Sequence, residues 1–88
     1  METNNYEAAI EAILFTMGES VEIAKIAKAL ELTKAQVKKI VANMQKELES
    51  DSRGIRIIEL ENAYQLCTKP EMYDYLIKVA KQPRRQVL

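Results

Sequence analysis

Hydrophobic residues recur every three to four positions over much of this chain, and the most regular run lies between residues 33 and 50. Thr33 begins the run, and its hydroxyl can accept a hydrogen bond from a free backbone N–H two or three residues later. The apolar positions share one side of a helix, with charged residues on the other. They are Val37, Ile40, Val41, Met44 and Leu48. This pattern predicts a long helix with one buried face and one wet face.

Two more helices are predicted ahead of this run. The first begins near Asn4 or Asn5 and ends at Gly18, a residue suited to the left-handed conformation that follows a helix. Its expected core stripe is Tyr6, Ile10, Ile13, Leu14 and Met17. The second runs from about Glu22 to Glu31, with Ile23, Ile26, Ala27 and Leu30 inward. The break at residues 32–33 is so short that the second and third helices form a predicted helix-turn-helix.

A β-hairpin is predicted after the turn residues 51–54. The segments IRIIELE and YQLCT are rich in residues that favour strands. A three-residue loop over 61–63 places Ile58, Leu60, Tyr64 and Leu66 on one apolar face, and we favour it. A two-residue loop at 62–63 would instead set Glu59 and Glu61 beside Leu66 and Tyr64.

A fourth helix is predicted from Pro70, whose missing N–H is harmless in a first turn, to Pro83. Its expected inward stripe is Met72, Leu76, Val79 and Ala80. The fold class is therefore α+β and mostly helical: a winged helix-turn-helix with three helices, a β-hairpin wing and a fourth, C-terminal helix. We expect ten core positions to be largely buried: Ile13, Leu14, Ile26, Leu30, Val37, Ile40, Met44, Ile58, Leu66 and Leu76.

Composition places the chain among globular domains, at 48% hydrophobic and 30% charged residues. The formal net charge is zero, whereas a dedicated nucleic-acid module is usually strongly basic. The N-terminus lacks the features of a secretory signal, and no apolar run is long enough to span a membrane. The single cysteine, Cys67, cannot form an internal disulfide. These features favour the cytoplasm.

The residues of common catalytic and metal sites are absent. The chain has no histidine, so Cys67 has no histidine partner and is interpreted as a half-buried structural thiol. Glu59 and Glu61 share one strand face and are interpreted as solvated. Gly18 and Gly54 are isolated, so no phosphate-binding loop is present. We expect a protein that is not an enzyme and holds no cofactor or metal.

Two surfaces are candidates for binding. On the first predicted helix, Ala8, Ala12 and Phe15 form a smaller apolar strip away from the core stripe, and Tyr73 and Ile77 lie beside the stripe of the fourth. Small residues one turn apart let another helix approach, and an exposed aromatic can anchor an interface. The alternative is that Phe15 packs into the core of its own domain.

The second candidate surface is the wet face of the third helix, with Lys34, Lys38, Lys39 and Lys46. A winged-helix transcriptional regulator would use these lysines on phosphates and Asn43 to read adenine. The helix offers no arginine for base contacts, and acidic residues flank the wing tip. The lysines can equally be a solvated face, or make weak, nonspecific DNA contacts.

Three stretches carry a resemblance to a known family: AAIEAILFTMGESVEIAKIAKAL, ENAYQLCTKPEM and KQPRRQVL. Together they resemble the N-terminal winged-helix domain of ScpB, the bacterial segregation and condensation protein. The chain departs from the family pattern at Ser20-Val21, where proline is usual after Gly-Glu, and at Asn62-Ala63, where Gly-Gly is frequent. By this resemblance, residues 1–82 are the N-terminal domain, and residues 83–88 begin a linker to a second winged-helix domain absent from this sequence.

The resemblance implies a non-enzymatic accessory subunit of the SMC–kleisin condensin complex. ScpB-like proteins form homodimers and bind the kleisin ScpA, which links the SMC heads, in chromosome condensation and segregation before cell division. The resemblance therefore favours an interface role for Phe15, a location at the nucleoid in the cytoplasm, and DNA contact that is at most weak. The transcriptional regulator remains the alternative.

Overall fold

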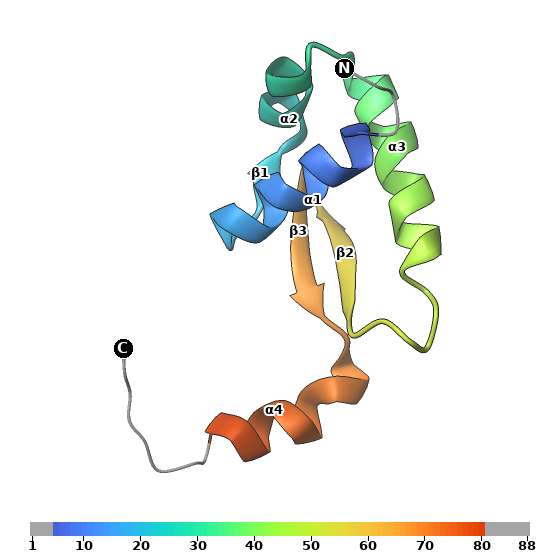
Figure 1. The fold of residues 1–88 in the computed structure, drawn as a ribbon. Helices are drawn as coiled ribbons and strands as arrows, with labels where there is room; N and C mark the ends of the chain where they lie inside the picture. Colours follow the sequence, from blue (N-terminus) through green and yellow to red (C-terminus); the bar gives the residue numbers. More distant parts are fainter. Residues whose placement is uncertain (1–4, 81–88) are drawn as a thin grey trace.

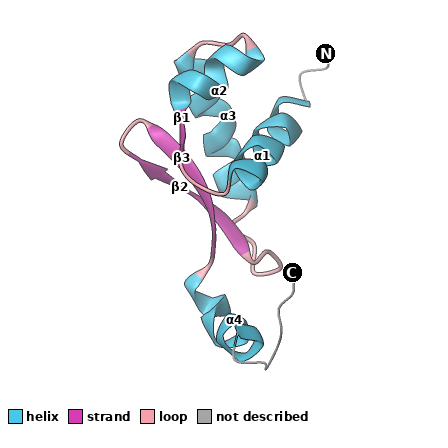
Figure 2. Ribbon diagram, turned by 90° about the vertical axis from the view of Figure 1, so that its left-hand side faces the viewer, coloured by secondary structure: helices cyan, strands magenta, loops and turns pink. Residues whose placement is uncertain are grey.

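The computed structural model describes residues 5–80, so the expected helix start at Asn4, the stop at Pro83 and the linker over 83–88 lie outside those residues. Three helices pack on one side of a small antiparallel sheet, and a fourth helix projects from the end of the hairpin (Figures 1 and 2). In chain order, the elements are α1 (Asn5–Met17), β1 (Val21–Glu22), α2 (Ile23–Leu30), α3 (Lys34–Glu47), β2 (Ile55–Leu60), β3 (Ala63–Thr68), the 3-10 turn η1 (Pro70–Met72) and α4 (Tyr73–Ala80). This architecture confirms the predicted winged helix-turn-helix.

Capping hydrogen bonds hold the helix-turn-helix in place, and the one at Thr33 was predicted. The backbone N–H of Gln36 donates to the Thr33 hydroxyl at 3.1 Å, and the Thr33 N–H donates to the Gln36 side chain at 2.9 Å. Each bond satisfies a donor that the first turn of α3 leaves free. At the end of α2, Glu31 adopts a left-handed conformation with φ 58°, and the N–H of Leu32 reaches the carbonyl of Ala27 at 2.9 Å. These bonds turn the chain sharply between the two helices.

The core lies between the three helices and the sheet. The largest fully buried side chains are Ile10, Leu14, Ile26, Val37 and Val41. Of the ten predicted core residues, Leu14, Ile26, Val37 and Met44 are buried, and Ile13, Leu30, Ile40 and Leu66 are half-buried against the core. Met17 does not continue the α1 stripe, because it is 53% exposed at the helix end. The helical periodicity therefore identified the inward faces of the first three helices.

The favoured hairpin loop was wrong by one residue. The strands are joined by the two-residue turn Glu61–Asn62, with Leu60 opposite Ala63 and Ile57 opposite Leu66. Ile55 and Ile57 therefore share the core face with Tyr64 and Leu66, while the predicted Ile58 and Leu60 lie on the other face. Side chains alternate along a strand, so a one-residue shift exchanges the two faces. Both faces of β2 carry apolar residues, and alternation alone could not choose between them.

The short strand β1 was not predicted. Val21 pairs with Tyr64 and Glu22 with Ala63, and the backbone N–H of Ile23 donates to the carbonyl of Asn62 at 2.9 Å. This pairing fastens the hairpin turn to the start of α2. The turn of the wing is thereby held against the helical body.

The predicted packing of α4 was wrong. Leu76 is 43% exposed rather than buried, and no residue of α4 is buried. The helix lies away from α1, α2 and α3, beyond the end of the hairpin (Figure 1). The predicted stripe describes an apolar helix, but none of it is buried by the rest of residues 5–80.

Candidate protein-interaction surface

The outer side of α1 presents an apolar strip. Ala8 and Ala12 are exposed, and Phe15 is 76% exposed. Ile10 and Leu14 point the opposite way into the core. Successive residues of a helix are rotated by 100° about its axis, and this rotation places these two on the side away from the strip. The structure therefore excludes the alternative in which Phe15 packs into its own core.

The strip forms one wall of a groove between α1 and the hairpin. Ala8, Ala12 and Phe15 face Ile55 and Leu66 across an open space of about 450 Å³. Ile55 and Leu66 reach this position because the two-residue turn directs them to the helical side of the sheet. The sequence prediction did not place Ile55 in this surface. A prediction with the correct hairpin register would have done so.

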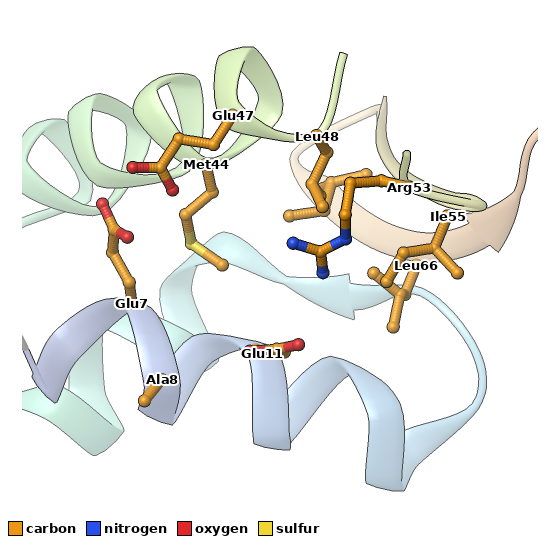
Figure 3. A pocket seen from close by; sticks show the side chains of 10 residues that line it. Glu7, Ala8, Glu11, Met44, Glu47, Leu48, Arg53, Ile55 and Leu66 are labelled. Carbon is orange, nitrogen blue, oxygen red and sulfur yellow. The ribbon is translucent and has the colours of Figure 1, made fainter. Parts of the chain in front are cut away.

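The groove continues into a smaller, more polar hollow of about 280 Å³ (Figure 3). Glu7 and Glu11 of α1 line it, together with Glu47 of α3 and Arg53 of the turn before β2. One of its lining residues, Glu7, accepts a hydrogen bond from the Asn43 amide at 2.7 Å. The groove thus has an apolar half beside Phe15 and a charged half beside Arg53.

The structure divides the five predicted interface residues into two groups. Ala8, Ala12 and Phe15 lie together in the groove, whereas Tyr73 and Ile77 lie on the projecting α4. Tyr73 is 59% exposed and Ile77 is 48% exposed. One chain therefore carries two separate apolar surfaces, and it does not bring them together.

The lysines of α3 form the other candidate surface. Lys34, Lys38, Lys39 and Lys46 are all exposed. Asn43, the residue assigned to adenine in the regulator hypothesis, is instead bonded to Glu7 at 2.7 Å, with Glu47 also in reach at 3.5 Å. A base-reading amide needs both its donor and its acceptor free in the major groove. This arrangement argues against sequence-specific readout by α3.

Cys67 and Tyr64, two further side chains with reactive groups, both lie on β3. Cys67 is half-buried on β3, as the sequence indicated. Burial raises the pKa of the Tyr64 phenol above 10.0, and the nearby Glu59 carboxylate raises it further. Among residues 5–80, no three His, Cys, Asp or Glu side chains are grouped as a metal site would require. None of the helices described has the length and apolarity needed to cross a membrane.

Comparison with known proteins identifies the family. A family model described as segregation and condensation complex subunit ScpB matches residues 8–88. The chain belongs to the ScpB family. A segregation and condensation protein B of Agathobacter rectalis is 59% identical over 85 residues, covering 96% of this chain and 46% of the relative. That of Lachnoclostridium phytofermentans is 50% identical, covering 100% of this chain and 47% of the relative. The chain spans about half the length of these ScpB relatives.

Solved ScpB structures share the fold. A crystal structure of a dimer of an ScpB N-terminal domain complexed with an ScpA peptide matches with a TM-score of 0.82 and 31% identity, covering 86% of this chain and 95% of that chain. ScpB from Mycobacterium tuberculosis matches with a TM-score of 0.87, covering 100% of this chain and 55% of that chain. Its identity of 20% supports the fold alone.

Proposed function

We propose that this chain is a non-enzymatic subunit module of the bacterial SMC–kleisin condensation complex. In this role it forms a homodimer, binds an ScpA-type kleisin and, through the kleisin, acts with SMC in chromosome segregation at the nucleoid in the cytoplasm. Residues 1–82 are the unit that does so, as an N-terminal winged-helix domain. The supporting observation is the match to an ScpB N-terminal domain that is itself a dimer with an ScpA peptide, because that domain is covered over 95% of its length.

The exposed side chains support the dimer. Phe15 is a large aromatic that is 76% exposed and lines the groove, so most of its ring is left uncovered by residues 5–80. Burying such a side chain contributes about 1.5–3 kcal/mol, and a twofold interface buries it twice. Ala8, Ala12, Tyr73 and Ile77 are the other interface residues that we propose.

The Phe15→Glu variant tests the dimer. Loss of both aromatic anchors should weaken dimerisation by about 100- to 10,000-fold, because 1.4 kcal/mol corresponds to a factor of ten. Sedimentation velocity should then show a monomer, and circular dichroism should show unchanged helicity. Ala42→Glu is the matched control, since it places the same charge on an exposed position of α3. An unfolded Phe15→Glu chain, or a dimer of unchanged affinity, would contradict the proposal.

Kleisin binding is tested separately by titrating an ScpA-type kleisin fragment into the wild-type chain and into the Ala42→Glu control. Calorimetry should show saturable binding to both. Absence of binding to a folded, dimeric wild-type chain would remove the kleisin part of the proposal and leave the dimer intact.

A further inference from the structure

The strand β2 lies at one edge of the sheet. The strand order is β1-β3-β2, so among residues 5–80 β2 pairs with β3 on one side and with no strand on the other. Just before β2, the N–H of Lys69 donates to the carbonyl of Gly54 at 2.9 Å, and in an antiparallel ladder such bonds recur at every second residue. The even-numbered residues of β2 thus bond to β3. The others direct their N–H and C=O groups to the open edge: Ile55, Ile57 and Glu59.

The sequence of β2 favours pairing with a further strand. The segment IRIIEL contains three isoleucines, one positive and one negative charge, and neither proline nor glycine. Short segments with high strand propensity, low net charge and no proline readily add to strands of other molecules. Both faces of β2 are apolar, with Ile57 on the core face and Ile58 and Leu60 on the outer face. An uncovered β2 edge would therefore expose the domain to association through its strands.

Gln45 of α3 covers the middle of this edge. Its side-chain amide donates to the carbonyl of Ile57 at 2.9 Å, in a part-buried position. The amide reaches this carbonyl because α3 lies on the side of β2 opposite β3 (Figure 1). A further strand would need the same carbonyl as an acceptor for its own N–H. The Gln45 amide therefore competes with strand addition.

Ile57 is also the position about which two β2 strands can pair most fully. An antiparallel pair centred there joins each Ile57 to its copy by two backbone hydrogen bonds and gives the longest ladder. This register sets Arg56 opposite Ile58 and Ile55 opposite Glu59, so no like charges face each other. Such a pair can form only after the Gln45 side chain has left the carbonyl in each copy.

We propose that Gln45 blocks the addition of β2 from a second copy of this chain to the edge of the sheet. Natural sheets protect their edges with charged residues, proline, bulges or a covering element, and here a side chain of α3 does so. The inference is independent of the homodimer proposed above, which uses α1 and α4 rather than this edge. Because the same hydrogen bond ties the wing to α3, association has to be measured apart from stability.

Sedimentation velocity of Gln45→Ala over a concentration series tests the block. Two Gln45 bonds no longer have to break for each pair, so edge pairing should strengthen by about 10- to 100-fold. The variant should form species larger than the wild-type dimer. If the wild type is a monomer, the homodimer fails and the variant should still pair. Lys46→Ala is the matched control, because it shortens an exposed side chain that points about 100° away on α3, and it should sediment as wild type.

Disulfide formation identifies the strands that pair. In a Gln45→Ala, Cys67→Ala background, one tagged chain carries Arg56→Cys and one untagged chain carries Ile58→Cys. In the proposed register these positions form a non-hydrogen-bonded pair with Cα atoms about 4.5 Å apart, which suits a disulfide. Cys67 is removed because it lies opposite Arg56 in the same chain. We expect the tagged–untagged disulfide to be the main product of mild oxidation.

Three outcomes would overturn the block. The first is a Gln45→Ala chain that is folded by circular dichroism and associates no more than wild type; Gln45→Met, of similar length but without a donor, serves if the alanine variant does not fold. The second is an equal yield of the disulfide between positions 56 and 58 when Gln45 is retained, because the edge would then already be open. The third is an equal yield when Glu22→Cys on β1 replaces Arg56→Cys, because association would then not follow the β2 register.

Discussion

Two glycines of this domain differ in what a methyl group would do to them. Gly18 follows α1 with φ 67°, a conformation that only glycine adopts without cost. Gly54 has no such backbone, and a Cβ there would lie in ordinary contact with Met72 at 3.6 Å. The two positions therefore predict opposite responses to the same substitution.

Gly18→Ala should lower the free energy of unfolding by about 1–2 kcal/mol, the cost of the left-handed conformation for a residue with a Cβ. Gly54→Ala should leave it unchanged or raise it by about 0.4–1 kcal/mol, because alanine restricts the unfolded chain and fits the folded one. Urea unfolding at a fixed protein concentration measures both. Equal losses in the two variants would show that backbone conformation is not what separates these positions.

Tyr64 links stability to alkaline pH. It is 2% exposed, and its raised pKa means that the folded state favours the neutral phenol more strongly than the unfolded state does. This contribution is complete below pH 10 and is lost as the pH rises through the folded pKa. Glu59, its cross-strand neighbour, acts in the same direction.

Tyr64→Phe should therefore lose less stability than the wild type between neutral pH and about pH 11, because the ionisable hydroxyl is gone while the ring remains. Tyr75→Phe, at an exposed position of α4, controls for removal of one hydroxyl. Free energies of unfolding measured across this range provide the test. An alkaline loss that is the same in Tyr64→Phe and in wild type would contradict the assignment.

At the scale of elements, α3 joins the helical layer to the sheet. Its residues Val37 and Val41 are fully buried in the core. The Gln45 side chain donates to the carbonyl of Ile57 at 2.9 Å, and the Asn43 side chain donates to Glu7 of α1. The helix thus contacts the core, the wing and α1 on three sides. Its lysines Lys34, Lys38, Lys39 and Lys46 are exposed.

Met44→Ala should lower the free energy of unfolding by about 2–5 kcal/mol, since Met44 is 7% exposed and its loss leaves a cavity. Ile40→Ala on the same helix should cost less, because Ile40 is only half-buried. Chemical denaturation followed by circular dichroism compares the two. A larger loss for Ile40→Ala would mean that the burial along α3 is misassigned.

At the scale of the whole molecule, the shape is open. The radius of gyration is 15.0 Å, against about 12 Å for a compact chain of this length, and the longest dimension is 46 Å. The excess comes from α4, which projects beyond the hairpin (Figure 2).

The lysine face should contribute little to function. Replacing Lys38, Lys39 and Lys46 together by Gln should leave kleisin binding within about twofold, since exposed charges away from an interface are worth little. Any DNA binding should be weak and nonspecific. Because each lysine can neutralise one phosphate, the salt dependence of the DNA affinity should fall in the variant by the equivalent of up to about three phosphate contacts. Electrophoretic mobility shifts over a salt series measure this. Tight, sequence-selective binding at about 150 mM salt that these changes abolish would favour the regulator instead.

The sequence by itself determined the helices, the two strands of the hairpin and most of the core. Helical periodicity identified the inward faces of α1, α2 and α3, and Thr33 and Gly18 marked two of their ends. These features are local: a cap or an apolar stripe is specified by residues within a few positions of one another. The same local pattern showed that Phe15 points away from the α1 core stripe.

Tertiary structure decided which residues and which elements face one another. The two-residue turn, in which Asn62 adopts φ 58°, set the register of β2 on β3, and it brought Ile55 rather than Ile58 and Leu60 to the groove beside Leu66. The position of α4 depended on contacts from Lys69 and Met72 to the distant Ser50–Gly54 turn. An apolar stripe states that a helix must be buried but not against which surface, because hydrophobic burial has no direction. For that reason the sequence predicted a packed α4, and only the assembled fold left it projecting.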